Sequence, residues 1–497
     1  MAIPPHSHPS PVPDRRRRVI VLLICSMSLL IVGLDVTIVN VALPAIHRSL
    51  HAGVSGLQWT IDAYTLVIAT LLMLSGSTAD RVGRRRVFQI GLLLFSLGSL
   101  MCALAPNLGL LIGARALQAI GGSMLNPVAM SIIRNVFTDP RERAQAIGVW
   151  GGMIGISIAL GPVVGGLLVD TFSWRAVFLV NVPIGILAIV LTALFVPESR
   201  ADRPRRVDPV GQLLVIVALA SVVYAIIEAP SAGWLSAQTL ALGGVCVIAL
   251  AALIRYEKRV SQPLIEMRFF RSAPFSGATA LAVGVFTIQG GFLFLNTLYL
   301  QQSRGFSPLH AGLDTLPMAL PLLVMAPITG RFVGTHGARV PLLAGAVATT
   351  AGGLMLTQLT ATTSMAYLFG AYVLIGLGMG LFNPPITNTA VSGMPPSMAG
   401  VAAAVASTAR QGGSTLGVAV FGVLAGSRGI TGVSAGFAAA THAAWWLAVG
   451  IGVTLFVIGF ATTTPWARRT AERAAETIEE ETAAASPPNA EARLVAH

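Results

Sequence analysis

Long apolar runs alternate with short polar or basic segments along almost the whole chain. Apolar residues make up 54% of the 497 positions, and charged residues make up only 10%. A helix needs about 20 mostly apolar residues to cross a bilayer core of roughly 30 Å. Runs of this kind lie near 19–43, 57–79, 87–105, 108–133, 144–169, 176–196, 210–229, 238–256, 275–300, 310–330, 340–359, 365–390, 400–426 and 442–464. The pattern predicts an all-α membrane protein with fourteen transmembrane helices.

Basic residues gather in alternate loops between these runs. One set of loops carries Arg15–Arg18, Arg84–Arg86, Arg134, Arg205, Arg255, Arg331 and Arg468, and the opposite set holds little beyond Arg48, Arg175, Arg304 and Arg428. Loops rich in arginine face the cytoplasm, and an even number of spans leaves both ends of the chain on one side. We therefore expect both termini in the cytoplasm. The net charge of +12 lies in these loops without the aromatic or motif context of a nucleic-acid site, which excludes that function.

The two ends of the chain repeat each other. The spacing of Gly76, Asp80, Gly83 and Arg85 recurs as Gly330, Gly334, Gly337 and Arg339. We predict a cytoplasmic tail at 1–18, a six-helix bundle at 19–196, a linker with two inserted spans and an interfacial helix at 197–274, a second six-helix bundle at 275–464 and a disordered cytoplasmic tail at 465–497. Repeated bundles in a membrane protein indicate alternating access, with the substrate site between the halves.

A glycine and acid followed by arginines lie between spans 2 and 3. This stretch, Gly76, Asp80, Arg81, Gly83 and Arg84, resembles the inner-loop signature of the major facilitator superfamily, and nearly the whole chain resembles its fourteen-span drug:proton antiporters. The resemblance implies the major facilitator fold and a conformational switch at this loop. Glycine permits the tight turn, and the acid can meet a helix N-terminus or an arginine in one access state. The alternative is a basic loop that only sets the topology.

Two charged residues lie within the apolar spans. Asp35 follows Leu34 in span 1, in a stretch similar to the first-span signature of the fourteen-span exporters, and Arg115 lies in span 4 with Gln118 on the same helix face. A charge at this depth costs about 3 kcal/mol even on lenient scales, so each residue needs a partner or a function. Depth along the spans puts both in the outer half. The resemblance implies proton coupling by Asp35 and Arg115, and a structural acid or ion pair is the alternative.

Small residues recur along span 5. Gly155, Gly161, Pro162, Gly165 and Gly166 are similar in placement to the signature that marks antiporters within the superfamily. Small residues at this spacing let helices approach closely, and proline bends a helix, so the stretch suits a surface on which the halves rock. Ordinary glycine-mediated packing is the alternative interpretation.

Four further residues are candidates for the substrate path. Depth along their spans puts Asp62 and Asp314 in the outer half as well. They resemble acidic positions of exporters of cationic drugs, and Asp314 favours a cationic substrate, although a water-facing position at the mouth is an equal alternative for each. Asn383 precedes two prolines that break span 12, which suits a residue lining a cavity. Arg410 lies near the middle of span 13, and we expect it to pair across the interface between the halves.

The resemblance implies a proton-coupled antiporter that exports hydrophobic, in part cationic, drugs or antibiotics. The alternatives are a symporter or facilitator for a small nutrient and a non-transporting membrane sensor. The span 5 signature disfavours the first, and the short loops disfavour the second. We expect no enzymatic activity, cofactor or metal, because no nucleotide loop, metal cluster or nucleophile with its base is evident. The arginine-rich and alanine-rich composition, with Lys258 the only lysine, indicates a bacterial cytoplasmic membrane protein, and we expect a monomer in the lipid bilayer.

Overall fold

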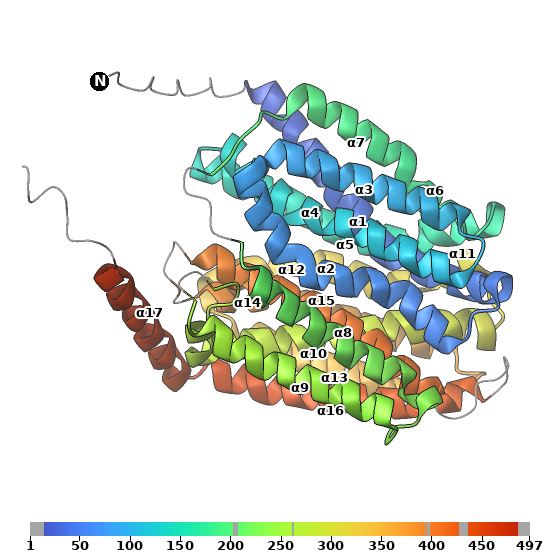
Figure 1. Ribbon diagram of the computed structural model, residues 1–497. Coiled ribbons are helices and arrows are strands. Elements are labelled where there is room, and N and C mark those ends of the chain that lie inside the picture. The colour runs from blue at the N-terminus through green and yellow to red at the C-terminus, as the bar shows by residue number, and fades with distance from the viewer. Residues whose placement is uncertain are drawn as a thin grey trace, which may run out of the picture.

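The computed structural model describes residues 14–201, 207–260, 263–392, 394, 398–426 and 436–485. The regular elements in these ranges are helices (Figure 1). The first half comprises α1 (Arg15–Leu50), α2 (Val54–Val82), α3 (Arg84–Leu104), α4 (Leu108–Val136), α5 (Pro140–Thr171), α6 (Ala176–Leu179) and α7 (Asn181–Phe195), followed by α8 (Pro209–Ala232) and α9 (Ala237–Glu257). The second half comprises η1 (Met267–Arg271), α10 (Ala273–Leu298), η2 (Tyr299–Ser303), α11 (Pro308–Asp314), α12 (Leu316–His336), α13 (Arg339–Leu356), α14 (Met365–Val391), α15 (Ala399–Gly426), α16 (Phe437–Thr462) and α17 (Pro465–Ala485).

The long helices match the predicted spans. Within the described ranges, thirteen helices are long and apolar enough to cross a membrane, with α6 and α7 forming one span and α11 and α12 another. A fourteenth long helix, α15, has 28 residues, packs against α10 and α2, and carries the polar Arg410 and Gln411 near its middle. With α15 the structure has the predicted fourteen spans. The first span is longer than predicted, because helix α1 already begins at Arg15 and continues through Pro44 to Leu50.

Packing divides the helices into two sets. In the first set α1 lies against α4, α5 and α7, and α4 lies against α2 and α3. In the second set α14 lies against α10, α12 and α13, and α16 packs on α13 and α10. Successive helices run in opposite directions, so the loops after α2, α4, α7, α9, α12, α14 and α16 share one end of the molecule, at the left in Figure 1. We call this arginine-rich end the basic end.

The inserted helices α8 and α9 form a hairpin at the side of the molecule. Helix α8 contacts α2 of the first set and α15 of the second. The α2 contact is polar at both ends, because Trp59 Nε1 donates to Glu228 Oε1 at 3.0 Å and the Gln212 side chain donates to the Thr70 carbonyl. Helix α9 instead leaves most of its side chains uncovered, as expected for a surface that faces lipid. The hairpin therefore bridges the two sets through α8 alone, and α9 lies on its outer side.

The predicted disordered tail is wrong over its first part. Residues 465–485 form helix α17, and the remaining residues, 486–497, lie outside the described part of the chain. One face of α17 repeats Ala467, Ala471, Ala474 and Ile478 at helical spacing, and these four residues are buried. They pack near η1, the short helix that was expected in the interface, whose Phe269 is itself fully buried. An amphipathic helix docked on the bundle thus replaces the first two thirds of the expected tail.

Candidate functional site

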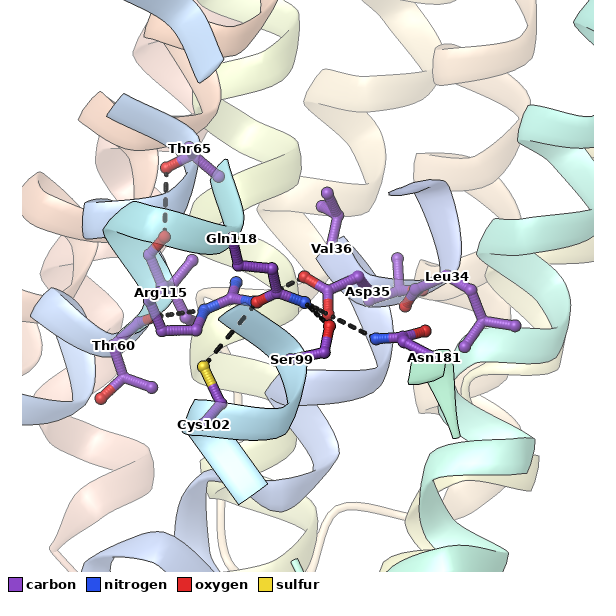
Figure 2. Close-up of polar contacts among 12 residues, drawn as sticks. Leu34, Asp35, Val36, Thr60, Thr65, Ser99, Cys102, Arg115, Gln118 and Asn181 are labelled. Carbon is purple, nitrogen blue, oxygen red and sulfur yellow. Dashed lines mark hydrogen bonds and ion pairs between the residues drawn. The ribbon is translucent and has the colours of Figure 1, made fainter. Parts of the chain in front are cut away.

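Asp35 and Arg115 form a fully buried ion pair inside the first set of helices. Nη1 of Arg115 lies 2.5 Å from Oδ2 of Asp35, and the two side chains are 1% and 0% exposed. The second carboxylate oxygen, Oδ1, accepts hydrogen bonds from Gln118 Nε2 at 2.8 Å and from Asn181 Nδ2 at 3.1 Å (Figure 2). Arg115 also donates to the Thr60 carbonyl at 3.0 Å and to Gln118 Oε1 at 2.7 Å. Four helices, α1, α2, α4 and α7, therefore meet at one carboxylate and one guanidinium.

Two aromatic rings lie beside the guanidinium of the ion pair. The guanidinium carbon of Arg115 lies 4.1 Å from the centre of the Tyr64 ring and 5.7 Å from that of Phe178. Gln118 extends the polar network by donating to Ser99 Oγ at 2.8 Å. A buried pair in such surroundings is stable only while both charges and their hydrogen bonds remain, and removing one partner typically costs about 3–5 kcal/mol. The arrangement can therefore couple a change in protonation of Asp35 to a change in helix packing.

The sequence indicated only part of this network. Asp35, Arg115 and Gln118 were all expected from the pattern, and the structure brings them into direct contact. The roles of Asn181 and Ser99 were not foreseen. A lone asparagine at the start of an apolar span is a weak signal that could have drawn attention to Asn181, whereas serine is too common in transmembrane helices to distinguish Ser99.

A cavity of about 810 Å³ lies between the two sets of helices. The first set lines it with Gly33, Val36, Asn126, Met130 and Trp150, and the second with Phe286, Gln289, Met379, Asn383 and Arg410. Asp35 does not border the cavity, although Val36 and Thr37 do. The ion pair is thus one residue behind the cavity wall. A shift of α1 would therefore change both the cavity wall and the ion pair.

The cavity extends to the basic end. Its lining includes Asp80 and Arg134 near the C-terminal ends of α2 and α4, Asp208 at the start of α8, and Leu264 before η1. The polar mouth residues belong to loops and helix ends rather than to the middle of the spans. A molecule of drug size, which typically occupies a pocket of about 300–1,000 Å³, fits the volume.

The opposite end is closed by close contacts between the two sets. A Cβ atom on Gly312 of α11 would lie 2.2 Å from the Pro162 carbonyl oxygen of α5, and one on Gly166 would lie 2.5 Å from Leu309 Cα. Asp170 Oδ2 accepts a hydrogen bond from the Leu309 amide at 2.9 Å. Glycines are required here because the backbones of α5 and α11 touch.

A second seal lies between α2 and α15. Gln58 Nε2 donates to the carbonyls of Val418 and Ala419 at 3.0 and 2.8 Å, and Gly422 lies directly against the Gln58 side chain. A third contact joins α1 to the second set through Gln301 Nε2, which donates to the Val41 carbonyl at 2.9 Å. The molecule is therefore open at the basic end and closed at the other.

The four glycines of the predicted span 5 signature, Gly155, Gly161, Gly165 and Gly166, all face other helices. Gly161 and Gly165 lie against Thr37 and Ile38 of α1, where a Cβ would come within 1.9 and 2.7 Å of side-chain atoms. Gly155 faces Leu323 of α12 in the second set at 2.6 Å. Pro162 occupies the contact with α11 described above. The predicted signature thus lies along one helix that touches both sets.

The loop between α2 and α3 forms a compact polar turn. Asp80 Oδ1 accepts from Nη2 of Arg84 at 2.9 Å, which is the arginine contact that the sequence indicated as one possibility for this acid. Gly83 has a φ of +126°, in the region that glycine favours, and contacts the Glu198 carboxylate. Arg81 is exposed, and Gly76 faces Pro127 of α4. The turn ties α2, α3 and the segment after α7 together.

We predict that Gly83→Ala lowers the export expected from the sequence about tenfold, because a side chain at this φ strains the backbone by roughly 1–3 kcal/mol and displaces Glu198. Export by cells producing the variant measures the effect. Gly337→Ala is the matched control, since Gly337 has a φ of +85° but faces open space. Equal losses in the two variants would show that the Glu198 contact is unimportant.

Asp62 and Asp314 do not border the cavity in this conformation. Asp62 is fully buried in α2, where its Oδ1 accepts from Thr65 at 3.4 Å, and its Oδ2 has no hydrogen-bond partner in the described part of the chain. Asp314 ends α11 and lies 3.4 Å from Nε2 of His310. Both acids lie toward the closed end. Depth along a span indicated their level in the membrane but could not indicate which neighbours they face.

Asn383 and Arg410 do border the cavity. The expected pairing of Arg410 across the interface is wrong for this conformation, because its side chain donates to Thr387 Oγ1 at 3.1 Å and to Ser407 Oγ at 2.8 Å. Both hydroxyls belong to the second set. No carboxylate among the described residues forms an ion pair with Arg410.

Comparison with known proteins agrees with this geometry. The family model described as Major Facilitator Superfamily matches residues 25–418. Multidrug resistance protein Stp of Mycobacterium tuberculosis is 40% identical, with coverage of 82% of this chain and 76% of the relative. The tetracenomycin C resistance and export protein of Streptomyces glaucescens is 36% identical over the same shares. A solved bacterial homolog of the human lysosomal transporter Spinster aligns with a TM-score of 0.64 over 93% of this chain and 99% of that chain, at 18% identity.

Two bundles around a central cavity, with a buried charge pair beside it, define a membrane transporter of the alternating-access class. The chain belongs to the major facilitator superfamily.

Proposed function

We propose that the protein is a proton-coupled antiporter that exports hydrophobic, drug-like molecules across a bacterial cytoplasmic membrane. The observation that carries the proposal is the Asp35–Arg115 ion pair, which lies one residue behind the wall of a cavity open at one end only. The names of the relatives support drug or antibiotic export as the direction and cargo.

The basic end is assigned to the cytoplasm. Its loops carry most of the arginines, and basic loops are retained on the cytoplasmic side of bacterial membranes. In this orientation both termini are cytoplasmic and the cavity opens inward, where an exporter collects its substrate. The cavity and the ion pair lie within one chain, which supports a monomer as the functional unit.

The transport cycle follows from the two states of Asp35. In the inward-open form Asp35 is ionised and paired with Arg115, and the substrate enters from the cytoplasm. Closure of the basic end and separation of α5 from α11 and of α2 from α15 then expose the cavity to the outside. A proton from that side neutralises Asp35, and Arg115 loses its counterion. The return to the inward-open form releases the proton into the cytoplasm and restores the pair.

The membrane potential drives this cycle. One proton that moves inward contributes roughly 2.3 kcal/mol for each 100 mV. Asp80, Arg84 and the turn at Gly83 serve as the switch at the basic end, because Asp80 borders the mouth of the cavity and its pair with Arg84 joins α2 to α3. The span 5 glycines serve as the surface on which the two sets move.

Substrate-dependent proton release from energised inside-out vesicles tests the proposal. A pH-sensitive dye reports the acid lumen, and tetracenomycin C and ethidium serve as probes of different charge. We expect at least one probe to release protons in vesicles with the wild-type protein and not in vesicles with Asp35→Asn. Export that persists after an uncoupler has collapsed the proton gradient would contradict proton coupling. Proton movement in the same direction as the probe would indicate a symporter.

A further inference from the structure

Arg410 is the charged side chain that lies deepest in the cavity. It comes from the middle of α15, far from the loops at either end, and it is partly buried. Its only hydrogen bonds in the described part of the chain go to Thr387 Oγ1 and Ser407 Oγ. A guanidinium has five N–H donors in a planar fork. Most of the donors of Arg410 are therefore free for a group inside the cavity.

The two hydroxyls orient the guanidinium without neutralising it. The Thr387 hydroxyl donates a hydrogen bond to the Asn383 carbonyl, and the Ser407 hydroxyl donates one to the Ala403 carbonyl, so both hydroxyl oxygens accept from Arg410. They hold the fork in place and leave its charge intact. This is the geometry of a preorganised donor group rather than of a structural ion pair.

Arg115 shows how this chain treats an arginine with a structural or coupling role. Arg115 has a carboxylate at 2.5 Å and is closed off from the cavity. Arg410 has neither feature. A charge within the membrane is retained only where it is compensated or used, and the compensation for Arg410 is missing from the protein groups described.

The remaining charges of the cavity lie at its mouth and leave the charge of Arg410 unbalanced. Asp80 is neutralised by Arg84, and Asp208 has one oxygen occupied by the Gly211 amide at 2.8 Å and the Tyr256 hydroxyl at 3.1 Å. Both acids lie at the mouth, as does Arg134. The acids that would attract a cation in the membrane, Asp62 and Asp314, are outside the cavity in this conformation, as described above.

Apolar and polar groups share the cavity around Arg410. Gln289, Asn383 and Gln411 contribute amide groups to the same lining, and Phe286, Met379 and Trp150 supply large apolar surfaces. A ligand that satisfies both must carry an anionic group on a broad hydrophobic or aromatic body. Carboxylates suit the planar fork of an arginine because they accept two parallel hydrogen bonds.

We propose that Arg410 selects amphipathic organic anions, with a carboxylate or a similarly delocalised oxyanion, as the preferred substrates of the cavity. The inference rests on the proposed function in that it takes the cavity as the substrate site. It goes beyond that proposal by assigning the charge of the cargo and the residue that recognises it.

Binding of two matched dyes to the purified full-length protein in lipid nanodiscs tests this selection. Fluorescein is an anion at neutral pH, tetramethylrhodamine methyl ester is a cation, and the two share the xanthene core. Fluorescence anisotropy gives each dissociation constant. We expect Arg410→Gln to weaken fluorescein binding at least about tenfold, equivalent to about 1.4 kcal/mol, and to leave the cationic dye within about threefold. Arg410→Lys retains the charge and is expected to lose less.

Arg134→Gln serves as the matched control, because Arg134 also borders the cavity but lies at the exposed mouth. It should change fluorescein binding by less than about threefold, as expected for an exposed charge. The proposal is overturned if Arg410→Gln weakens the binding of both dyes equally. It is also overturned if wild type and Arg410→Gln bind fluorescein equally well or if neither binds it. The assay requires no proton gradient. Anion selection without proton-driven transport would therefore contradict the proposed antiport alone, and transport without anion selection would contradict this inference alone.

Discussion

Asp35→Asn is expected to abolish proton-coupled export, with a fall of at least about 100-fold, because breaking a buried ion pair on one side costs roughly 3–5 kcal/mol. Asparagine still accepts hydrogen bonds from Gln118 and Asn181, so the local packing remains, but it can neither take up a proton nor balance the charge of Arg115. Uncoupler-sensitive efflux from cells, compared at equal protein abundance, measures the loss.

Two companion variants separate coupling from folding. Asp35→Glu keeps a carboxylate and is expected to retain part of the export. The double variant Asp35→Asn with Arg115→Gln removes both charges, so we expect its thermal stability to recover toward that of wild type while its export remains absent. Full export by Asp35→Asn, or recovery of export in the double variant, would show that the pair is purely structural.

Much of the fold could be predicted because few backbone structures can cross a membrane. A span must satisfy its backbone hydrogen bonds within a helix, so the length of the apolar runs and the basic loops were sufficient to give the number and order of the spans. Helix α15 was predicted from the same reasoning although Arg410 lowers its apolarity. Its inward-facing arginine is tolerated because α15 packs between α10 and α2 and borders the cavity.

For the candidate site, the depth of each residue in the membrane could be predicted, but the helix that each side chain faces could not. Depth placed Asp35, Arg115, Asp62 and Asp314 in the same half of the membrane, and the first two do meet. Asp62 and Asp314 face other helices instead, because a helix rotated by a few residues points the same side chain at a different neighbour. Asn181 reaches Asp35 only because α7 packs on α1, a long-range contact that no local pattern contains.

The tail contains a helical signal that its composition hides. Its alanine and glutamate content indicates disorder, whereas the spacing of its apolar residues indicates a helix. The recurrence of Ala467, Ala471, Ala474 and Ile478 three or four residues apart predicts one buried helix face, and the structure has that face against the start of α10.

Gly312→Val is expected to reduce export to background by preventing closure of the end opposite the basic loops. The added Cβ would lie 2.2 Å from the Pro162 carbonyl oxygen, a backbone atom that cannot move without displacing α5. Overpacking of this kind typically costs about 1–3 kcal/mol, enough to favour the outward-open form over the inward-open form by a large factor. Labelling of a cysteine at Asn383, in a protein with Cys246 replaced by serine, measures this shift.

In wild type, an impermeant maleimide should label the cysteine at position 383 from the cytoplasmic side, because Asn383 borders the cavity that opens there. In the Gly312→Val variant, labelling from that side should slow and labelling from the outside should rise, and Gly312→Ala should show a smaller shift in the same direction. Gly152→Val is the matched control on α5, since no atom lies within 4 Å of a Cβ at Gly152. Unchanged labelling and export in Gly312→Val would mean that α5 and α11 separate too easily to form a seal, and the closed end would then depend on the Gln58 contacts between α2 and α15.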